Sequence, residues 1–249
     1  MAKRLVPLSY FELLEACAQP GCPMCRLEAR VIRDYLDAIL YENVNDPGTQ
    51  AELRRSWGYC PDHARQLPEV SGGPALGVAI LYRQIIGDAL REMEQARYVP
   101  ASRWSLKPVQ EALDRRQAAA ATGAVVRRLQ PEARCPACVH RDKMIDLALD
   151  TLLEALGRDD EPMIQALGAS AGLCLPHLRR ALKLMRDEAA FAALRSIVQG
   201  KLARLKHELD EFIRKNDYRF QPEGFGAEGD SWLRALAWLA GTEIRSSGD

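Results

Sequence analysis

The feature that most constrains this chain is a pattern of cysteines and histidines that occurs twice. A Cys-Pro-x-Cys motif occurs at Cys22-Pro23-Met24-Cys25 and again at Cys135-Pro136-Ala137-Cys138. Further along each half, a Ser-x-Gly-x-Cys-x-x-His motif ends at His63 and again at His177. Six of the seven cysteines follow this scheme, and Cys17 falls outside it. Self-similarity at a long, fixed period indicates an internal duplication, here of a unit of about 100 residues.

The repeated pattern predicts two metal sites, most simply for zinc. A CxxC motif supplies two thiolates that converge on one ion, and a Cys-x-x-His motif supplies two further ligands of a tetrahedral site. Because each half contains one motif of each kind, we expect the ligands of one half to share one ion. The expected sets are Cys22, Cys25, Cys60 and His63 in the first half, and Cys135, Cys138, Cys174 and His177 in the second.

The residues around these ligands favour helix N-termini and tight turns. Pro23 and Pro136 fit the first turn of a helix, where free backbone N–H groups and the helix dipole stabilise a thiolate. Gly58 and Gly172 stand two residues before the third cysteine of each half, where a glycine permits a sharp turn. We therefore expect the metal ligands to lie at the ends of helices.

Hydrophobic periodicity predicts an all-α protein. No run of β-branched and aromatic residues alternates with polar residues over the length of a strand, whereas helical patterns recur throughout. We expect duplicated helical halves with a pseudo-twofold relation, each held by one Cys3His site. Helices are expected over residues 9–18, 23–41, 49–57, 62–67, 74–97, 109–130, 136–156, 161–167, 176–185, 188–215 and 231–239.

The chain divides by sequence into four segments. Residues 1–97 form a first helical metal-binding half, and residues 98–130 form a linker and connecting helix. Residues 131–216 form the second metal-binding half, and residues 217–249 form a C-terminal tail and helix. The sequence leaves open whether the halves share one core, and it leaves the oligomeric state open.

Composition bears on the location of the protein and on its partners. The chain has 34 Lys and Arg residues and 34 Asp and Glu residues. With no net charge, it has no overall electrostatic attraction to nucleic acid or to an anionic membrane. The N-terminus lacks the apolar core of a signal peptide, and no apolar stretch reaches the ~20 residues of a membrane span. We therefore expect a cytoplasmic protein, in which patterned cysteines serve as ligands rather than disulfides.

Other interpretations of the cysteines stay open. An iron-sulfur cluster also uses thiolates and accepts a histidine, which would make the chain a redox enzyme. A thioredoxin-like centre would use CPxC, but it normally accompanies a βαβ pattern and leaves Cys60 and His63 without a role. A metal-dependent enzyme would use Glu42 and Asp46 beside a metal that loses a ligand. Ordinary buried thiols have no reason to repeat in step with histidines.

The leading hypothesis for function is a metal-binding helical scaffold or adaptor with a protein partner. Four protein ligands leave no open position for a catalytic zinc, and no phosphate loop or nucleotide fingerprint is present in the sequence. Whether the chain is an enzyme is left open, with a non-catalytic role favoured. Nucleic-acid binding is a further hypothesis, through the basic pairs Arg54-Arg55, Arg127-Arg128 and Arg179-Arg180.

The same motifs resemble a known protein family. CPMC, LYENVND and GYCPDH in the first half, and CPAC, GLCLPH and EFIRKNDYRF in the second, resemble an uncharacterised bacterial family of domain-of-unknown-function proteins. The resemblance covers about Leu8 to Trp232 and includes both Cys-His sets. It implies no activity, because the family has none assigned, so the metal prediction depends on the residues themselves.

Overall fold

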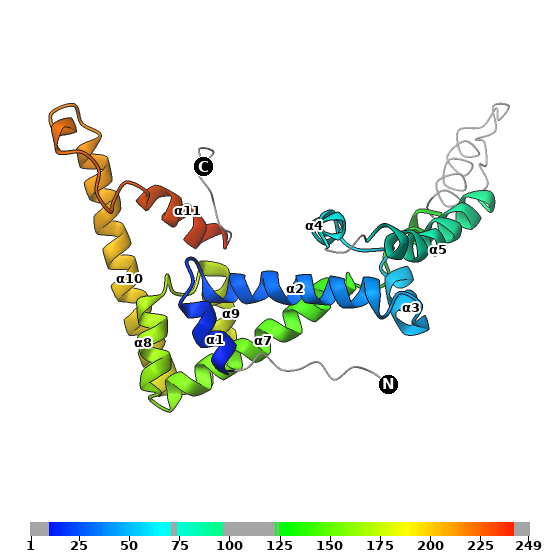
Figure 1. The fold of residues 1–249 in the computed structure, drawn as a ribbon, viewed down its shortest axis with the longest axis horizontal. Coiled ribbons are helices and arrows are strands. Elements are labelled where there is room, and N and C mark those ends of the chain that lie inside the picture. Colours follow the sequence, from blue (N-terminus) through cyan, green and yellow to red (C-terminus); the bar gives the residue numbers. More distant parts are fainter. Residues whose placement is uncertain (1–9, 71–73, 97–122, 124, 242–249) are drawn as a thin grey trace, which may run out of the picture. The chain divides into compact units, whose positions relative to one another are not determined.

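The computed structural model describes residues 10–70, 74–96, 123 and 125–241, and in these residues the fold is all-α (Figure 1). They contain helices and short 3-10 turns but no strand, which confirms the predicted fold class. None of the helices in this part of the chain is both long enough and apolar enough to cross a membrane. The chain forms two compact units: unit 1 combines Met1–Val31 with Arg141–Asp249, and unit 2 is Ile32–His140.

Unit 1 takes its helices from both ends of the chain. Asp160 and Asp187 begin two of them by accepting hydrogen bonds from the backbone N–H groups of Met163 and Ala190, at 2.9 and 2.7 Å. The unit contains α1 (Tyr10–Cys17), the start of α2 (Pro23–Tyr41), most of α7 (Pro136–Gly157), α8 (Glu161–Ala169), α9 (Leu175–Leu184), α10 (Glu188–Lys215), the 3-10 turn η2 (Gln221–Glu223) and α11 (Ser231–Ala240).

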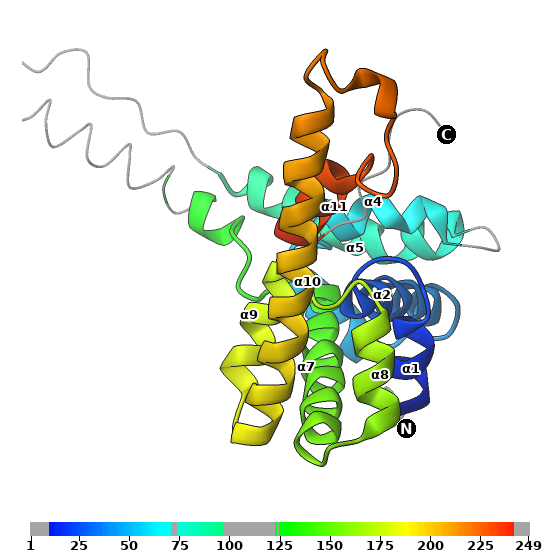
Figure 2. The same ribbon diagram turned by 90° about the vertical axis from the view of Figure 1, so that its left-hand side faces the viewer.

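The core of unit 1 joins residues that are far apart in sequence. Helix α1 packs against α8 (Figure 2). The Tyr10 hydroxyl donates a hydrogen bond of 2.6 Å to the Asp160 carboxylate. Burial of large apolar side chains from both ends of the chain supplies most of the stabilisation. The largest fully buried members are Leu13, Met24, Leu27, Ile145, Leu149, Leu152, Leu156, Met163, Leu167 and Leu173.

Unit 2 is smaller and has its own core. It contains the rest of α2, α3 (Pro47–Arg55), α4 (Pro61–Gln66), the 3-10 turn η1 (Leu67–Glu69), α5 (Ala75–Glu94) and the start of α7. Asp46 caps α3, because its carboxylate accepts a hydrogen bond of 2.7 Å from Thr49 N–H, and α3 therefore begins two residues earlier than predicted. The core is formed by Ile32, Leu36, Ile39, Leu40, Leu53, Tyr59, Leu67, Val70, Leu81, Ile85 and Ala137.

The compact units do not follow the segments predicted from sequence. Helix α2 begins in unit 1 and continues into unit 2, and α7 begins in unit 2 and continues into unit 1. Each unit therefore contains parts of both sequence halves. Most of the predicted linker and connecting helix, residues 98–130, lies outside the described residues.

Candidate metal centres

The structure gathers the eight predicted ligands into two clusters, but not in the predicted pairs. Cluster 1 consists of Cys22, Cys25, Cys174 and His177, and cluster 2 consists of Cys60, His63, Cys135 and Cys138. In each cluster the ligand atoms lie within 4.8 Å of one another. The prediction that each half completes its own site is wrong, because each cluster joins the CxxC motif of one half to the CxxH motif of the other.

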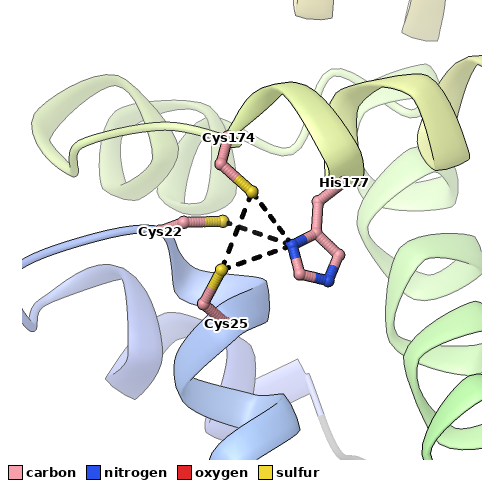
Figure 3. Close-up of side chains that lie close together, drawn as sticks. All are labelled: Cys22, Cys25, Cys174 and His177. Carbon is pink, nitrogen blue, oxygen red and sulfur yellow. Dashed lines mark hydrogen bonds between the residues drawn. The ribbon is translucent and has the colours of Figure 1, made fainter. Parts of the chain in front are cut away.

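Cluster 1 lies within unit 1, where the start of α2 meets the start of α9 (Figure 3). His177 Nδ1 is 3.1 Å from Cys174 Sγ, 3.5 Å from Cys25 Sγ and 3.8 Å from Cys22 Sγ. The sulfur atoms of Cys25 and Cys174 are 3.7 Å apart. Cys174 and His177 are buried, with 2% and 6% of their surface exposed, whereas Cys22 and Cys25 are partly exposed.

Cluster 2 lies within unit 2 and has almost the same internal distances. His63 Nδ1 is 3.2 Å from Cys60 Sγ, 3.4 Å from Cys138 Sγ and 3.6 Å from Cys135 Sγ. The sulfur atoms of Cys60 and Cys138 are 3.7 Å apart. His63 is buried, and the three cysteines are partly exposed.

These distances match a tetrahedral zinc site. Zn–S bonds of about 2.3 Å and Zn–N bonds of about 2.0–2.1 Å place two ligand sulfurs about 3.8 Å apart and a sulfur and a nitrogen about 3.5 Å apart. The sulfur pairs at 3.7 Å and the sulfur–nitrogen pairs at 3.1–3.8 Å agree with these values. They are far longer than the ~2.05 Å bond of a disulfide, and all seven cysteines are free. The donor set and its spacing therefore fit one zinc ion in each cluster.

The lengths of the helices explain why the ligands exchange between halves. Helix α2 has 19 residues and carries the chain about 28 Å away from Cys22. Helix α3 follows with 9 residues, or about 13 Å, and is too short to bring the chain back. Helices α7 and α8, with 22 and 9 residues, repeat this mismatch in the second half. The within-half prediction assumed that the second helix would bring the chain back to the CxxC motif, which a helix of half the length does not do.

Each cluster lies where two helix N-termini meet. Pro23 and Pro136 are the first residues of α2 and α7, as predicted. Cys60 and Cys174 are the N-cap residues of α4 and α9, with φ/ψ of −63°/163° and −67°/163°. Three thiolates and a neutral imidazole around Zn²⁺ carry one net negative charge. The positive ends of two helix dipoles would stabilise that charge in each cluster.

A turn with left-handed backbone delivers the third cysteine of each motif. Gly58 and Gly172 have φ of +91° and +76°, a conformation that strongly favours glycine, as predicted. The buried serine of each motif shapes this turn: Ser56 Oγ donates to Gly58 O at 2.9 Å, and Gly172 N–H donates to Ser170 Oγ at 3.0 Å. The serine therefore belongs to the turn, a role that its place in the motif does not reveal.

Protons in cluster 1 are shared among the ligands. Hydrogen bonds with Cys174 and Cys25 lower the pKa of Cys22, whereas hydrogen bonds with Cys174 and Cys22, together with burial, raise the pKa of Cys25. Burial disfavours a charged His177, but its hydrogen bonds with Cys174 and Cys22 outweigh this effect and raise the pKa of His177 to about 10. A metal ion that binds here must displace these protons, so binding weakens as the pH falls.

A carboxylate outside the ligand set faces the far side of the His177 ring. Glu28 Oε2 lies 3.5 Å from His177 Nε2, and Glu28 Oε1 lies 2.9 Å from Arg141 Nε. A metal-binding histidine commonly donates its second ring N–H to a carboxylate, which fixes its tautomer and raises the basicity of the ligand nitrogen. Glu28 is therefore the carboxylate placed to accept a hydrogen bond from the Nε2–H of His177, the tautomer in which Nδ1 is free to bind a metal.

The substitution Glu28→Gln is expected to weaken zinc binding at cluster 1 by about 10- to 100-fold, because the amide polarises the imidazole less than a carboxylate does. Titration against a competing chelator would measure this change. Affinity at cluster 2 should stay at its wild-type value, and Glu154→Gln, which removes the exposed partner of Arg158, serves as a matched control. Equal loss at both clusters would contradict the role assigned to Glu28.

Other residues singled out in the sequence have structural roles or lie outside the clusters. Asp46 caps α3, and neither Glu42 nor Asp46 belongs to either group of possible ligands. Arg54 pairs with Asp88, and Arg180 lies 2.6 Å from Asp146. These two arginines of the proposed basic pairs are therefore engaged with carboxylates.

Comparison with known proteins places the chain in a family without an assigned function. It is 26% identical over 233 residues to an uncharacterised 23.9 kDa protein in the xynA 3' region of Caldicellulosiruptor sp. (strain Rt8B.4), a match that covers 93% of this chain and all of the relative. No solved structure matches the chain. The model of the family of unknown function DUF6062 matches residues 7–246, and the resemblance noted in the sequence is thereby confirmed. With nearly its whole length matched, this chain belongs to the DUF6062 family.

Proposed function

We propose that the protein binds two zinc ions, one in each cluster, and that both ions are structural. The observation that carries this proposal is that two separate sets of three sulfurs and one imidazole nitrogen have the spacing of a tetrahedral zinc site. Four protein ligands complete the coordination of each ion and leave no position for a substrate or an activated water. The metal therefore holds the helix ends together and has no catalytic task.

We further propose that the zinc-bound helices serve as a scaffold or adaptor for another protein. An apolar row on α11, formed by Trp232, Leu236 and Leu239, supports this role, because these side chains are 44–55% exposed at helical spacing. Exposed apolar rows of this kind are typical of surfaces that contact other proteins. Nucleic-acid binding through the arginine pairs has less support, because Arg54 and Arg180 form ion pairs with Asp88 and Asp146.

Elemental analysis tests the metal proposal directly. The full chain is purified without added metal and without oxygen, and an absorption spectrum is recorded on the same sample. About two zinc ions per chain and no visible band are expected, because Zn²⁺ has a filled d shell and no redox chemistry. Iron with a broad visible band would instead make the protein an iron-sulfur or other redox protein, and would overturn the structural-zinc proposal.

A further inference from the structure

The C-terminal end of α11 lies directly against the sulfur atoms of cluster 1. Cys25 Sγ lies 3.1 Å from the backbone oxygen of Gly241. A Cβ at position 241 would lie 3.3 Å from Cys174 Sγ and 3.0 Å from Pro176 Cγ. Gly241 ends α11 with φ of +73°, so its missing side chain permits both the turn and the close approach. The end of α11 thus covers two ligands of the cluster.

A small number of polar contacts hold α11 in this position. The indole Nε1 of Trp238 donates a hydrogen bond of 3.0 Å to the backbone oxygen of Leu173, the residue before Cys174. Helix α11 packs against α10 (Figure 2). Near the start of α11, the guanidinium of Arg234 contacts Glu208 on α10. The hydroxyl of Ser231 is fully buried and has no hydrogen-bond partner in the described structure. The Trp238 hydrogen bond therefore ties the C-terminal part of α11 to the segment that carries Cys174.

The two clusters differ at the position that α11 covers. Cys174, the N-cap residue of the CxxH helix in cluster 1, has 2% of its surface exposed. Its counterpart Cys60 in cluster 2 is partly exposed. A chelator or an exchange partner removes a metal by reaching its ligands in turn, so a covered sulfur slows the process. The burial of the two cysteines therefore predicts different exchange rates for otherwise similar sites.

We propose that α11 is a lid for cluster 1. Cys174 is released from the metal only after α11 has left its position, so metal in cluster 1 exchanges more slowly than metal in cluster 2, whose cysteines are all partly exposed. This inference rests on the proposed binding of zinc. It goes further in that the C-terminal helix controls how fast the metal exchanges. Its opening is a local event of the kind that costs much less than global unfolding.

The rate of zinc loss to an excess of the coloured chelator 4-(2-pyridylazo)resorcinol tests the lid. The wild-type full chain, loaded with zinc, is expected to release it in two phases of equal amplitude. Cys60→Ser should lack the fast phase, and Cys25→Ser should lack the slow phase. Trp238→Phe removes the indole donor but keeps an aromatic ring, and should speed the slow phase about fivefold, since one hydrogen bond less holds the lid.

Two further variants complete the design. Gly241→Val places a branched side chain against Cys174 and Pro176 and should speed the slow phase at least as much as Trp238→Phe. Tyr218→Phe, at an exposed position beyond the end of α10, removes a polar donor and keeps the ring, as Trp238→Phe does; it is the matched control and should leave both phases unchanged. A single phase in the wild type, or a slow phase unaffected by Trp238→Phe, would overturn the lid while two bound zinc ions still upheld the proposed function. A chain that holds no zinc would overturn both.

Discussion

The double variant Cys25→Ser/Cys174→Ser is expected to retain one zinc ion per chain, whereas Cys25→Ser/Cys60→Ser is expected to retain none. Cys25 and Cys174 belong to the same cluster, with their sulfurs 3.7 Å apart, so the second substitution removes nothing further. Cys60 belongs to cluster 2, so its loss in the Cys25→Ser background destroys the remaining site. Elemental analysis of the purified variants measures both outcomes.

Thermal unfolding of the same variants provides a second readout. A structural zinc contributes on the order of 10 kcal/mol of apparent binding energy, which is comparable with the whole stability of a domain. We expect the wild type to show one cooperative unfolding transition for each zinc-bound unit. Cys25→Ser/Cys174→Ser should therefore keep one of these transitions, and Cys25→Ser/Cys60→Ser should lose both. The opposite pattern of zinc content, with one ion kept by Cys25→Ser/Cys60→Ser, would restore the within-half pairing predicted from sequence.

Residues 32–140, expressed alone, are expected to bind one zinc ion and to unfold cooperatively. This segment is unit 2, and it contains a separate apolar core and all four ligands of cluster 2. Residues 1–97 also contain four potential ligands, but two come from each cluster, and α2 would have to break to bring them together. Zinc binding by residues 1–97 should therefore be weaker by about 1,000-fold or more, or ~4 kcal/mol.

Competition titration of the two fragments against one chelator measures this difference. Residues 32–140 with Cys138→Ser form the matched control, which keeps the fragment and its core but removes one ligand. Equal affinity of residues 1–97 and residues 32–140 would show that the sequence half can close its own site. It would also contradict the division of the chain into the units described above.

The helices were predictable from sequence because their signals are local. Pro23 and Asp187 mark helix starts, and α2 and α10 have the bounds that periodicity predicts. Helix α3 begins two residues before its predicted start, because Asp46 is its N-cap and Pro47 occupies its first turn. Such errors are confined to the ends of elements.

The eight ligands were also recognisable, but their pairing was not. Spacing between cysteines measures distance along the chain, and 35 or so intervening positions are compatible with many separations in space. The pairing depends on how far α2 and α7 extend before the chain turns, and on which segments share a core. Leu13 and Leu27 from the first half pack with Ile145 and Leu167 from the second, a long-range choice that periodicity does not encode.

Glu28 and Gly241 were missed for the same reason. Neither belongs to a motif: Glu28 lies one helical turn after Cys25, and Gly241 is separated from Cys174 by the three helices α9, α10 and α11. The spacing of Cys25 and Glu28 gave a signal that could have been used, since residues three apart share a helix face. No local pattern predicts the approach of Gly241.

The crossed ligand sets have a consequence for assembly. A half-length chain with one CxxC and one CxxH motif would complete such a cluster only with a second copy of itself, each copy giving one motif to each ion, as in a twofold symmetric dimer. In the present chain both motifs of each cluster are covalently joined, so the encounter between them occurs within one molecule. Zinc affinity should therefore be independent of protein concentration, and dilution should not release the metal.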